Sequence, residues 1–152
     1  MNWDALGAIG EIVGALAVFV TLAYLAIQIR QNTGAVRASA LDASVSGIIG
    51  VREKIVEDPV LMEIYLKGLD NPESLNDIDK ARFTQFLHNI MWGLLNVHSQ
   101  ASFAALSSDI WESQKPVVLR VFSSQGGKWF FDAHGHEFPE SFSAEVRKIL
   151  EK

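Results

Sequence analysis

The sequence predicts an all-α protein in which one N-terminal transmembrane helix precedes a small cytosolic helical bundle. The first observation is an apolar run from Ala5 to Ile29, whose only charged residue is Glu11. The second is that apolar residues recur at helical spacing through most of the remaining chain, with no competing strand-like alternation. We therefore divide the chain into a membrane anchor, residues 1–30, and a cytosolic helical bundle, residues 31–152.

The amino-acid composition restricts the classes of protein to which this chain can belong. The chain has 152 residues, of which 49% are hydrophobic and 20% charged, which indicates a folded chain with a sizeable core rather than a disordered one. The net charge of −5 argues against a general nucleic-acid-binding protein. Because the chain has no cysteine, disulfides, Cys-ligated zinc or iron–sulfur clusters and thiol catalysis are excluded.

The apolar run is long enough to cross a bilayer. At about 1.5 Å per residue its 25 residues span roughly 37 Å, against a hydrocarbon core of about 30 Å. A cleaved signal peptide needs a basic start and a shorter apolar core, but residues 1–29 contain no lysine or arginine. A buried helix of a soluble protein is also disfavoured, because apolar residues occur all round this segment and the run is too long. A transmembrane anchor is therefore the favoured interpretation.

Charge predicts the orientation of this anchor. All 13 lysines and arginines follow the apolar run, beginning with Arg30. The excess of positive charge on the cytoplasmic side of membrane proteins places the N-terminus outside and residues 31–152 in the cytoplasm. Trp3 and Tyr24 are expected to lie near the two membrane interfaces, where such side chains are enriched.

Small residues form a seam along the apolar run, at alternating spacings of three and four. Such spacing puts them on one helix face and lets two backbones approach closely, which is how helices associate in lipid. We expect this seam to make the chain a homo-oligomer, although glycine and alanine are also common in membrane helices in general. The seam consists of Gly7, Gly10, Gly14, Ala17 and Thr21.

Glu11 flanks the seam at a depth where an ionised carboxylate is costly. One interpretation is a protonated side chain that hydrogen-bonds a neighbouring helix or reaches the outer headgroups. The other is an ion- or proton-handling group inside an oligomer. A single carboxylate with no second polar group at similar depth makes a poor proton relay, which favours the first interpretation.

The N-terminal segment GAIGEIVGALAVFVTLAYLAIQIRQNT, followed by VRASA, resembles the opening of a widespread, uncharacterised family of short bacterial membrane-anchored proteins. The resemblance is specific over residues 7–40 and looser afterwards, and residues 124–138 depart from it. It implies a single N-terminal span in the bacterial cytoplasmic (inner) membrane, an all-helical cytoplasmic part, and Glu11 as part of the family pattern. It implies no activity.

The remaining chain is predicted to form five helices. Pro59 suits the first turn of the second, Asn76 or Asp77 is expected to cap the third, and Ser108-Asp109 the fourth. Pro116 predicts a kink or a break, and Gln125–Gly127 predicts a turn. The third helix, apolar on much of its circumference, is expected at the centre of the bundle. The predicted ranges are 34–57, which continues the membrane helix almost unbroken, 59–69, 77–106, 109–123 and 139–150.

An aromatic cluster lies near the C-terminus and consists of Trp129, Phe130, Phe131, Phe138 and Phe142. Such a cluster either dips into lipid headgroups, holds an apolar ligand, or closes the core of the bundle. We favour the closing role, because a small bundle needs a lid against which its last helix can dock.

A weak metal-site candidate lies in the segment from Asp132 to Glu137, which contains His134 and His136. Two histidines separated by one residue present both rings on one side only in extended chain. The segment is predicted to be a flexible surface loop with no other histidine near in sequence, so we expect neither a metal nor another cofactor. His88 and His98 lie on different faces of one helix and are interpreted as histidines at the edge of the core.

No recognised catalytic motif is present, so the sequence gives no support for an enzyme. The favoured function is a homo-oligomeric structural or interaction module, whose partners are the bilayer and further copies of the chain. One alternative is an oligomeric ion or proton pathway lined by Glu11. Another is a membrane-tethered sensor or enzyme that binds a small ligand, or a metal at Asp132, His134 and His136.

Overall fold

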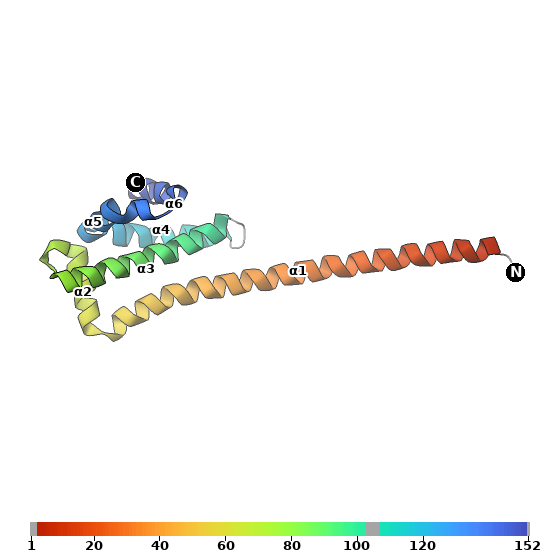
Figure 1. The fold of residues 1–152 in the computed structure, drawn as a ribbon, viewed down its shortest axis with the longest axis horizontal. Helices are drawn as coiled ribbons and strands as arrows, with labels where there is room; N and C mark the ends of the chain where they lie inside the picture. The colour runs from red at the N-terminus through yellow and green to blue at the C-terminus, as the bar shows by residue number, and fades with distance from the viewer. Residues whose placement is uncertain (1–2, 103–106, 152) are drawn as a thin grey trace. The chain divides into compact units, whose positions relative to one another are not determined.

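The computed structural model describes residues 3–102 and 107–151, and this part of the chain is all-helical, with no strand. The predicted fold class is confirmed to that extent. Residues 103–106, which end the predicted helix 77–106, lie outside the described residues. The elements, shown in Figure 1, are α1 (Trp3–Glu57), α2 (Pro59–Asp70), η1 (Pro72–Ser74), α3 (Asp77–Ser102), α4 (Ser108–Phe122), α5 (Gln125–His134), η2 (Gly135–Glu137) and α6 (Glu140–Leu150), where η marks a 3₁₀ helix.

Helix α1 includes both the predicted anchor and the predicted helix 34–57, with no interruption between them. The chain divides into two compact units, Met1–Ser39 and Ala40–Lys152, so α1 contributes to both. In the first unit every residue from Gly7 to Ser39 is exposed. By length and composition, α1 is a candidate membrane span.

Within the second unit, the last part of α1 packs through few side chains. Ser44 and Ile55 are buried, whereas Val45 and Val56 remain exposed. The Ser44 hydroxyl donates to the Ala40 carbonyl at 2.8 Å and accepts from Gln100 Nε2 at the same distance. Apolar spacing in this stretch therefore predicts the helix correctly but overstates how much of it is buried.

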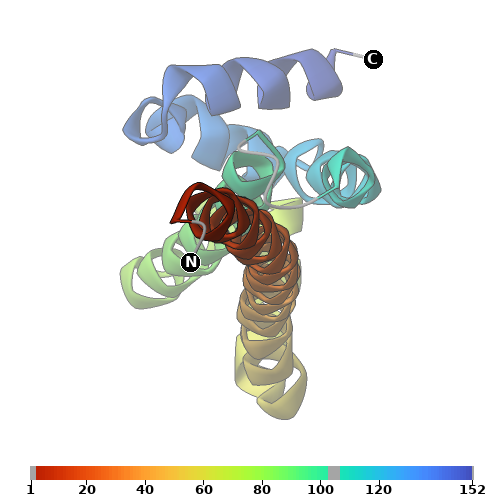
Figure 2. The same cartoon turned by 90° about the vertical axis from the view of Figure 1, so that its right-hand side faces the viewer.

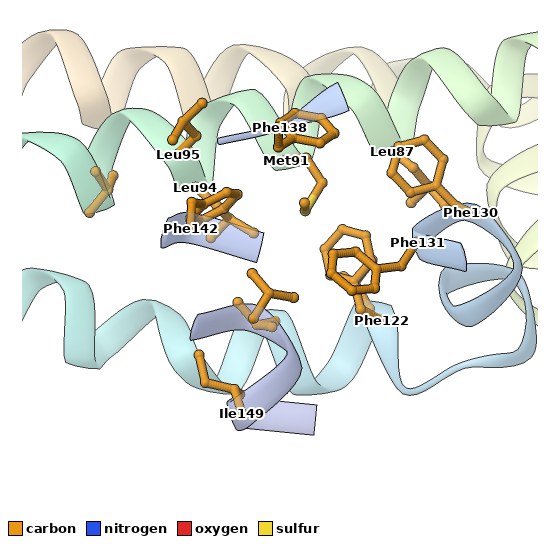
Figure 3. Close-up of a cluster of buried hydrophobic side chains, with 14 of the residues drawn as sticks. Leu87, Met91, Leu94, Leu95, Phe122, Phe130, Phe131, Phe138, Phe142 and Ile149 are labelled. Atoms are coloured by element: carbon orange, nitrogen blue, oxygen red, sulfur yellow. The ribbon is translucent and has the colours of Figure 1, made fainter. Parts of the chain in front are cut away.

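Helix α3 is the centre of the bundle, as its apolar circumference predicts, and it packs against α2, α4 and α5. Phe83, Leu87 and Met91 have no exposed surface. Figure 3 shows Met91 and Leu94 of α3 facing the side chains that α4, α5 and α6 supply. The core of the second unit is thus built on one face of α3.

Helix caps place the starts of α2, α3 and α4. Asp58 Oδ1 accepts from the Val60 amide at 2.8 Å, and Asn76 Oδ1 from the Asp79 amide at 2.9 Å. Ser107, one residue before the predicted cap of α4, accepts from the Asp109 amide at 3.3 Å. Helix α4 continues through the exposed Pro116 without the break that its sequence allowed.

The prediction of a turn at Gln125–Gly127 is wrong, because α5 begins at Gln125. Its N-cap is Ser124, whose hydroxyl accepts from the Gly127 amide at 3.0 Å. The predicted flexible loop from Asp132 to Glu137 is also wrong. That segment forms the end of α5 and the 3₁₀ helix η2, both held by the buried aromatic residues around them.

The aromatic cluster closes the core, as predicted. Phe130 and Phe142 have no exposed surface, and Phe131 and Phe138 are also buried. Helix α6 docks on α4 through Val146 and other buried residues. Figure 2 shows α6, in blue, along one side of this unit. The hydroxyl of Ser143 in α6 donates to the Gly135 carbonyl at 2.9 Å and so ties α6 to η2.

Candidate functional site

The predicted seam and Glu11 all lie on the first part of α1, where every seam residue is exposed. A Cβ atom added at Gly7, Gly10 or Gly14 would meet no other atom within 4 Å. The Thr21 hydroxyl donates to the Ala17 carbonyl at 2.8 Å, so its proton is already bonded within its own helix.

A largely apolar cavity of about 320 Å³ lies in the second unit, between the last turns of α1 and helices α2, α3 and α4. This volume is at the lower end of the range typical of small-molecule sites. Six of its thirteen lining residues are aliphatic, and its charged residues are two arginines. The lining residues are Arg52, Ile55, Val56, Met62, Tyr65, Asn89, Ile90, Gly93, Leu94, Gln114, Val117, Arg120 and Val121.

The two arginines come from separate elements, Arg52 from α1 and Arg120 from α4, and both act electrostatically on Tyr65. Burial raises the pKa of the Tyr65 hydroxyl, while the positive charges of Arg120 and Arg52 oppose that shift. An apolar cavity that carries only positive charges suits a ligand with an apolar body and an anionic end.

The three residues of the sequence-predicted metal candidate do not all gather at one place. Asp132 and His136 line a surface hollow that also contains Lys128 and Arg147. His134, by contrast, is directed to the Glu137 carboxylate, with Nδ1 and Oε1 2.7 Å apart. The helical conformation of this segment explains the separation, since alternate residues of a helix point in different directions.

His134 instead belongs to a cluster with Glu137 and His88. His88 Nε2 lies 2.9 Å from Glu137 Oε2, so the carboxylate bridges the two imidazoles. The ligand-type atoms of the three residues lie within 4.8 Å of one another. The His88 side chain is 15% exposed, that of His134 27% and that of Glu137 43%. This cluster therefore lies at the edge of the bundle, within reach of solvent.

Aromatic rings surround the two histidines. The His88 ring contacts Phe130 edge-on at 4.8 Å between centroids, and it lies 4.9 Å from the His134 ring. The Trp129 ring lies 6.4 Å from that of His134. Hydrogen bonds from His134 and then His88 hold the pKa of Glu137 below its ordinary value, which favours the ionised carboxylate.

Sequence reasoning missed His88 as a partner of the C-terminal histidines. His88 and Glu137 are 49 positions apart, and no local spacing relates an α3 residue to η2. The second core-edge histidine, His98, packs edge-on against the Trp111 ring, with 4.9 Å between the ring centroids. The useful signal for His88 is tertiary: it lies on the α3 face to which α5 docks.

No protein-family model, curated protein or solved structure matched this chain in the comparisons.

Proposed function

We propose that this chain is a single-pass protein of the bacterial cytoplasmic membrane and acts there as a homo-oligomeric structural or interaction module. The observation that carries this proposal is the exposed apolar surface of α1, continuous over Gly7 to Ile29. Monomeric soluble proteins rarely expose an apolar surface of that extent. A bilayer removes it from water, and the distribution of lysine and arginine favours an N-terminus outside with the bundle in the cytoplasm.

Assembly would use the small-residue seam of α1. The open space at the Cβ positions of Gly7, Gly10 and Gly14 allows a second helix to approach the backbone directly. Glu11, which flanks the seam, would form a hydrogen bond across the interface in its protonated form. Several bundles would then be held side by side at the membrane surface.

We expect the purified full-length chain to form a defined oligomer that the double substitution Gly10→Leu/Gly14→Leu reduces to a monomer. Two leucines on the seam would hold the backbones apart and remove the close packing that associates helices in lipid. The measurement is the mass of the protein in detergent or nanodiscs. Ala23→Leu/Ala26→Leu is the matched control, because it adds the same side chains to the opposite face of α1.

The control should keep the mass of the wild type. A monomeric wild type would overturn the assembly proposal. An unchanged mass in the Gly10→Leu/Gly14→Leu variant would show that the seam does not mediate assembly.

A second candidate function, favoured by the cavity in the bundle, is a membrane-tethered small-ligand-binding module. The aliphatic lining and the two arginines suit an anionic amphiphile such as a long-chain carboxylate. Membrane attachment would hold the cavity close to a source of such molecules.

For this candidate, we expect the full-length protein to bind dodecanoate, and Arg52→Gln/Arg120→Gln to weaken that binding at least about tenfold. Each charge-assisted hydrogen bond to the carboxylate contributes roughly 1.5–3 kcal/mol. Titration calorimetry measures the affinity, with Arg82→Gln as a control because Arg82 is outside the cavity. Equal affinities for dodecanoate and dodecanol in the wild type would contradict the role of the arginines.

A further inference from the structure

Three potential metal ligands meet at the edge of the bundle from three different elements. His88 comes from α3, His134 from the end of α5 and Glu137 from η2. The surrounding structure contacts each one: the rings of His88 and His134 lie 4.8 and 5.1 Å from that of Phe130, and η2 is tied to α6 by the bond between Ser143 and Gly135. The cluster is thus a product of the tertiary fold and not of local chain proximity.

Both ring nitrogens of His88 lie within hydrogen-bonding distance of oxygen atoms. Its Nδ1 lies 3.1 Å from the Thr84 carbonyl, and its Nε2 lies 2.9 Å from the Glu137 carboxylate. The Thr84 carbonyl can only accept a hydrogen bond, so Nδ1 is the ring nitrogen that donates to it.

The contact with Thr84 is the arrangement found around metal-binding histidines. Such a histidine donates its non-ligating N–H to a backbone carbonyl or a carboxylate, which fixes the tautomer and aims the other nitrogen at the metal. In His88 this donor is Nδ1, and the nitrogen left for a metal is Nε2. Nε2 faces the Glu137 carboxylate, which also contacts His134.

We infer that His88, His134 and Glu137 form a binding site for a divalent transition metal ion of the zinc class. Ligand distances of 2.0–2.2 Å place the donor atoms of a tetrahedral site about 3.3 Å apart. His88 Nε2 lies 2.9 Å from Glu137 Oε2, His134 Nδ1 lies 2.7 Å from Glu137 Oε1, and the three ligand atoms lie within 4.8 Å of one another, so small side-chain movements would bring them to these distances. The carboxylate is on the exposed η2 and is the ligand best able to move.

The ligand types select the ion. Two imidazole nitrogens and one carboxylate oxygen suit Zn²⁺ and its neighbours better than Mg²⁺ or Ca²⁺, which prefer ligand sets made of oxygen alone. The group contains three protein ligands in the described part of the chain. Zinc is usually four-coordinate, so a bound water would complete the site and leave one exchangeable position. The inference is independent of membrane insertion and of self-association.

The test uses the full-length protein, purified without a histidine tag and stripped of metal by a chelator. Titration calorimetry with Zn²⁺ is expected to give one ion per chain. His134→Ala and Glu137→Gln should each weaken binding by at least about 10- to 100-fold, because even outer-shell substitutions at metal sites cost that much. Co²⁺ should give the intense visible absorption of a four-coordinate ion.

His136→Ala is the matched control, since it removes an exposed imidazole two residues from His134, and it should leave the affinity unchanged. Near-UV circular dichroism checks that each variant is folded, and the exposed Glu137 provides a variant that keeps the core intact. The inference is overturned if the wild type binds less than one ion per chain, or if His136→Ala weakens binding as much as His134→Ala. It is also overturned if Glu137→Gln binds as tightly as the wild type.

Discussion

Replacing Gly126 by alanine is expected to destabilise the bundle by about 3 kcal/mol or more, one of the largest effects of any single methyl group added to this chain. The Cβ of that alanine would lie 1.9 Å from the Gly68 carbonyl oxygen and 2.8 Å from the carbon that bears it. Overpacking of a core costs about 1–3 kcal/mol where side chains can move. Here the obstacle is backbone, so α5 and α2 must separate.

The crossing of α2 and α5 explains why the obstacle cannot be avoided. Gly68 of α2 and Gly126 of α5 let the two backbones come into contact, and the buried ring of Phe83 lies beneath them. A Cβ on Gly68 would meet that ring at 2.4 Å. Separation of the helices would therefore also open a gap beside Phe83, which adds a cavity cost to the steric one.

Thermal unfolding of the full-length protein, followed by near-UV circular dichroism, measures this effect. For a bundle of this size, 3 kcal/mol corresponds to a decrease in Tm of more than about 10 °C. Gly47→Ala is the control, because Gly47 is also helical but its Cβ would have nothing within 4 Å. That variant should be more stable by about 0.5–1 kcal/mol. A Gly126→Ala protein that melts within 2 °C or so of the wild type would contradict the close crossing.

The same glycines show where sequence reasoning stopped. A Gly-Gly pair after Gln125 is a typical turn signal, and no local feature reveals that Gly126 is needed for contact with a helix 58 positions earlier. The N-cap Ser124 was the available local signal for a helix start at Gln125. The low helix propensity of two glycines disfavours a helix at this point, but tertiary packing outweighs that propensity.

The long helices were predictable for a different reason. Helix α3 carries enough apolar residues at helical spacing that its existence and central place follow from burial alone. The continuity of α1 through Thr33 and Gly34 is also consistent with the absence of any proline there. Pro116 does not end α4, because a proline inside a helix removes one backbone hydrogen bond without requiring the helix to end.

The candidate metal ligands were only partly predictable. His134 is visible as one of two nearby histidines, but the choice between it and His136 depends on which side of α5 and η2 faces α3. His88 enters only when α5 docks on α3, and the apolar cavity likewise appears only where four helices meet. Sites assembled from distant elements follow from the fold and leave little local pattern.

Truncation of Phe142 to alanine is expected to cost about 3–5 kcal/mol, as is usual for a fully buried phenylalanine. The ring has no exposed surface and is the point at which α6 enters the core. Its centroid lies 5.4 Å from that of His98 and 6.0 Å from that of Trp111, so it joins α6 to both α3 and α4. Figure 3 shows Phe142 among the buried side chains of the core.

The measurement is again thermal unfolding, with two variants for comparison. Ile78→Ala removes a side chain that is 68% exposed and should change stability by less than about 0.5 kcal/mol. Phe142→Leu keeps most of the apolar volume and should lose clearly less than the alanine variant. If the Phe142→Ala and Ile78→Ala variants had the same Tm, α6 would not be part of the cooperative core.

Because α6 contacts η2, the Phe142→Ala substitution is also expected to affect the cluster of His88, His134 and Glu137. Ser143 follows Phe142 and donates to the Gly135 carbonyl, so the docked α6 holds the 3₁₀ helix that carries Glu137. A bundle with a loosened α6 would leave that carboxylate poorly placed even where His88 and His134 keep their positions. Phe142→Ala, at a temperature where it is still folded, should therefore weaken Zn²⁺ binding without touching a ligand, whereas Ile78→Ala should not. Equal affinities in the two variants would mean that η2 is held by its own aromatic contacts and not by α6.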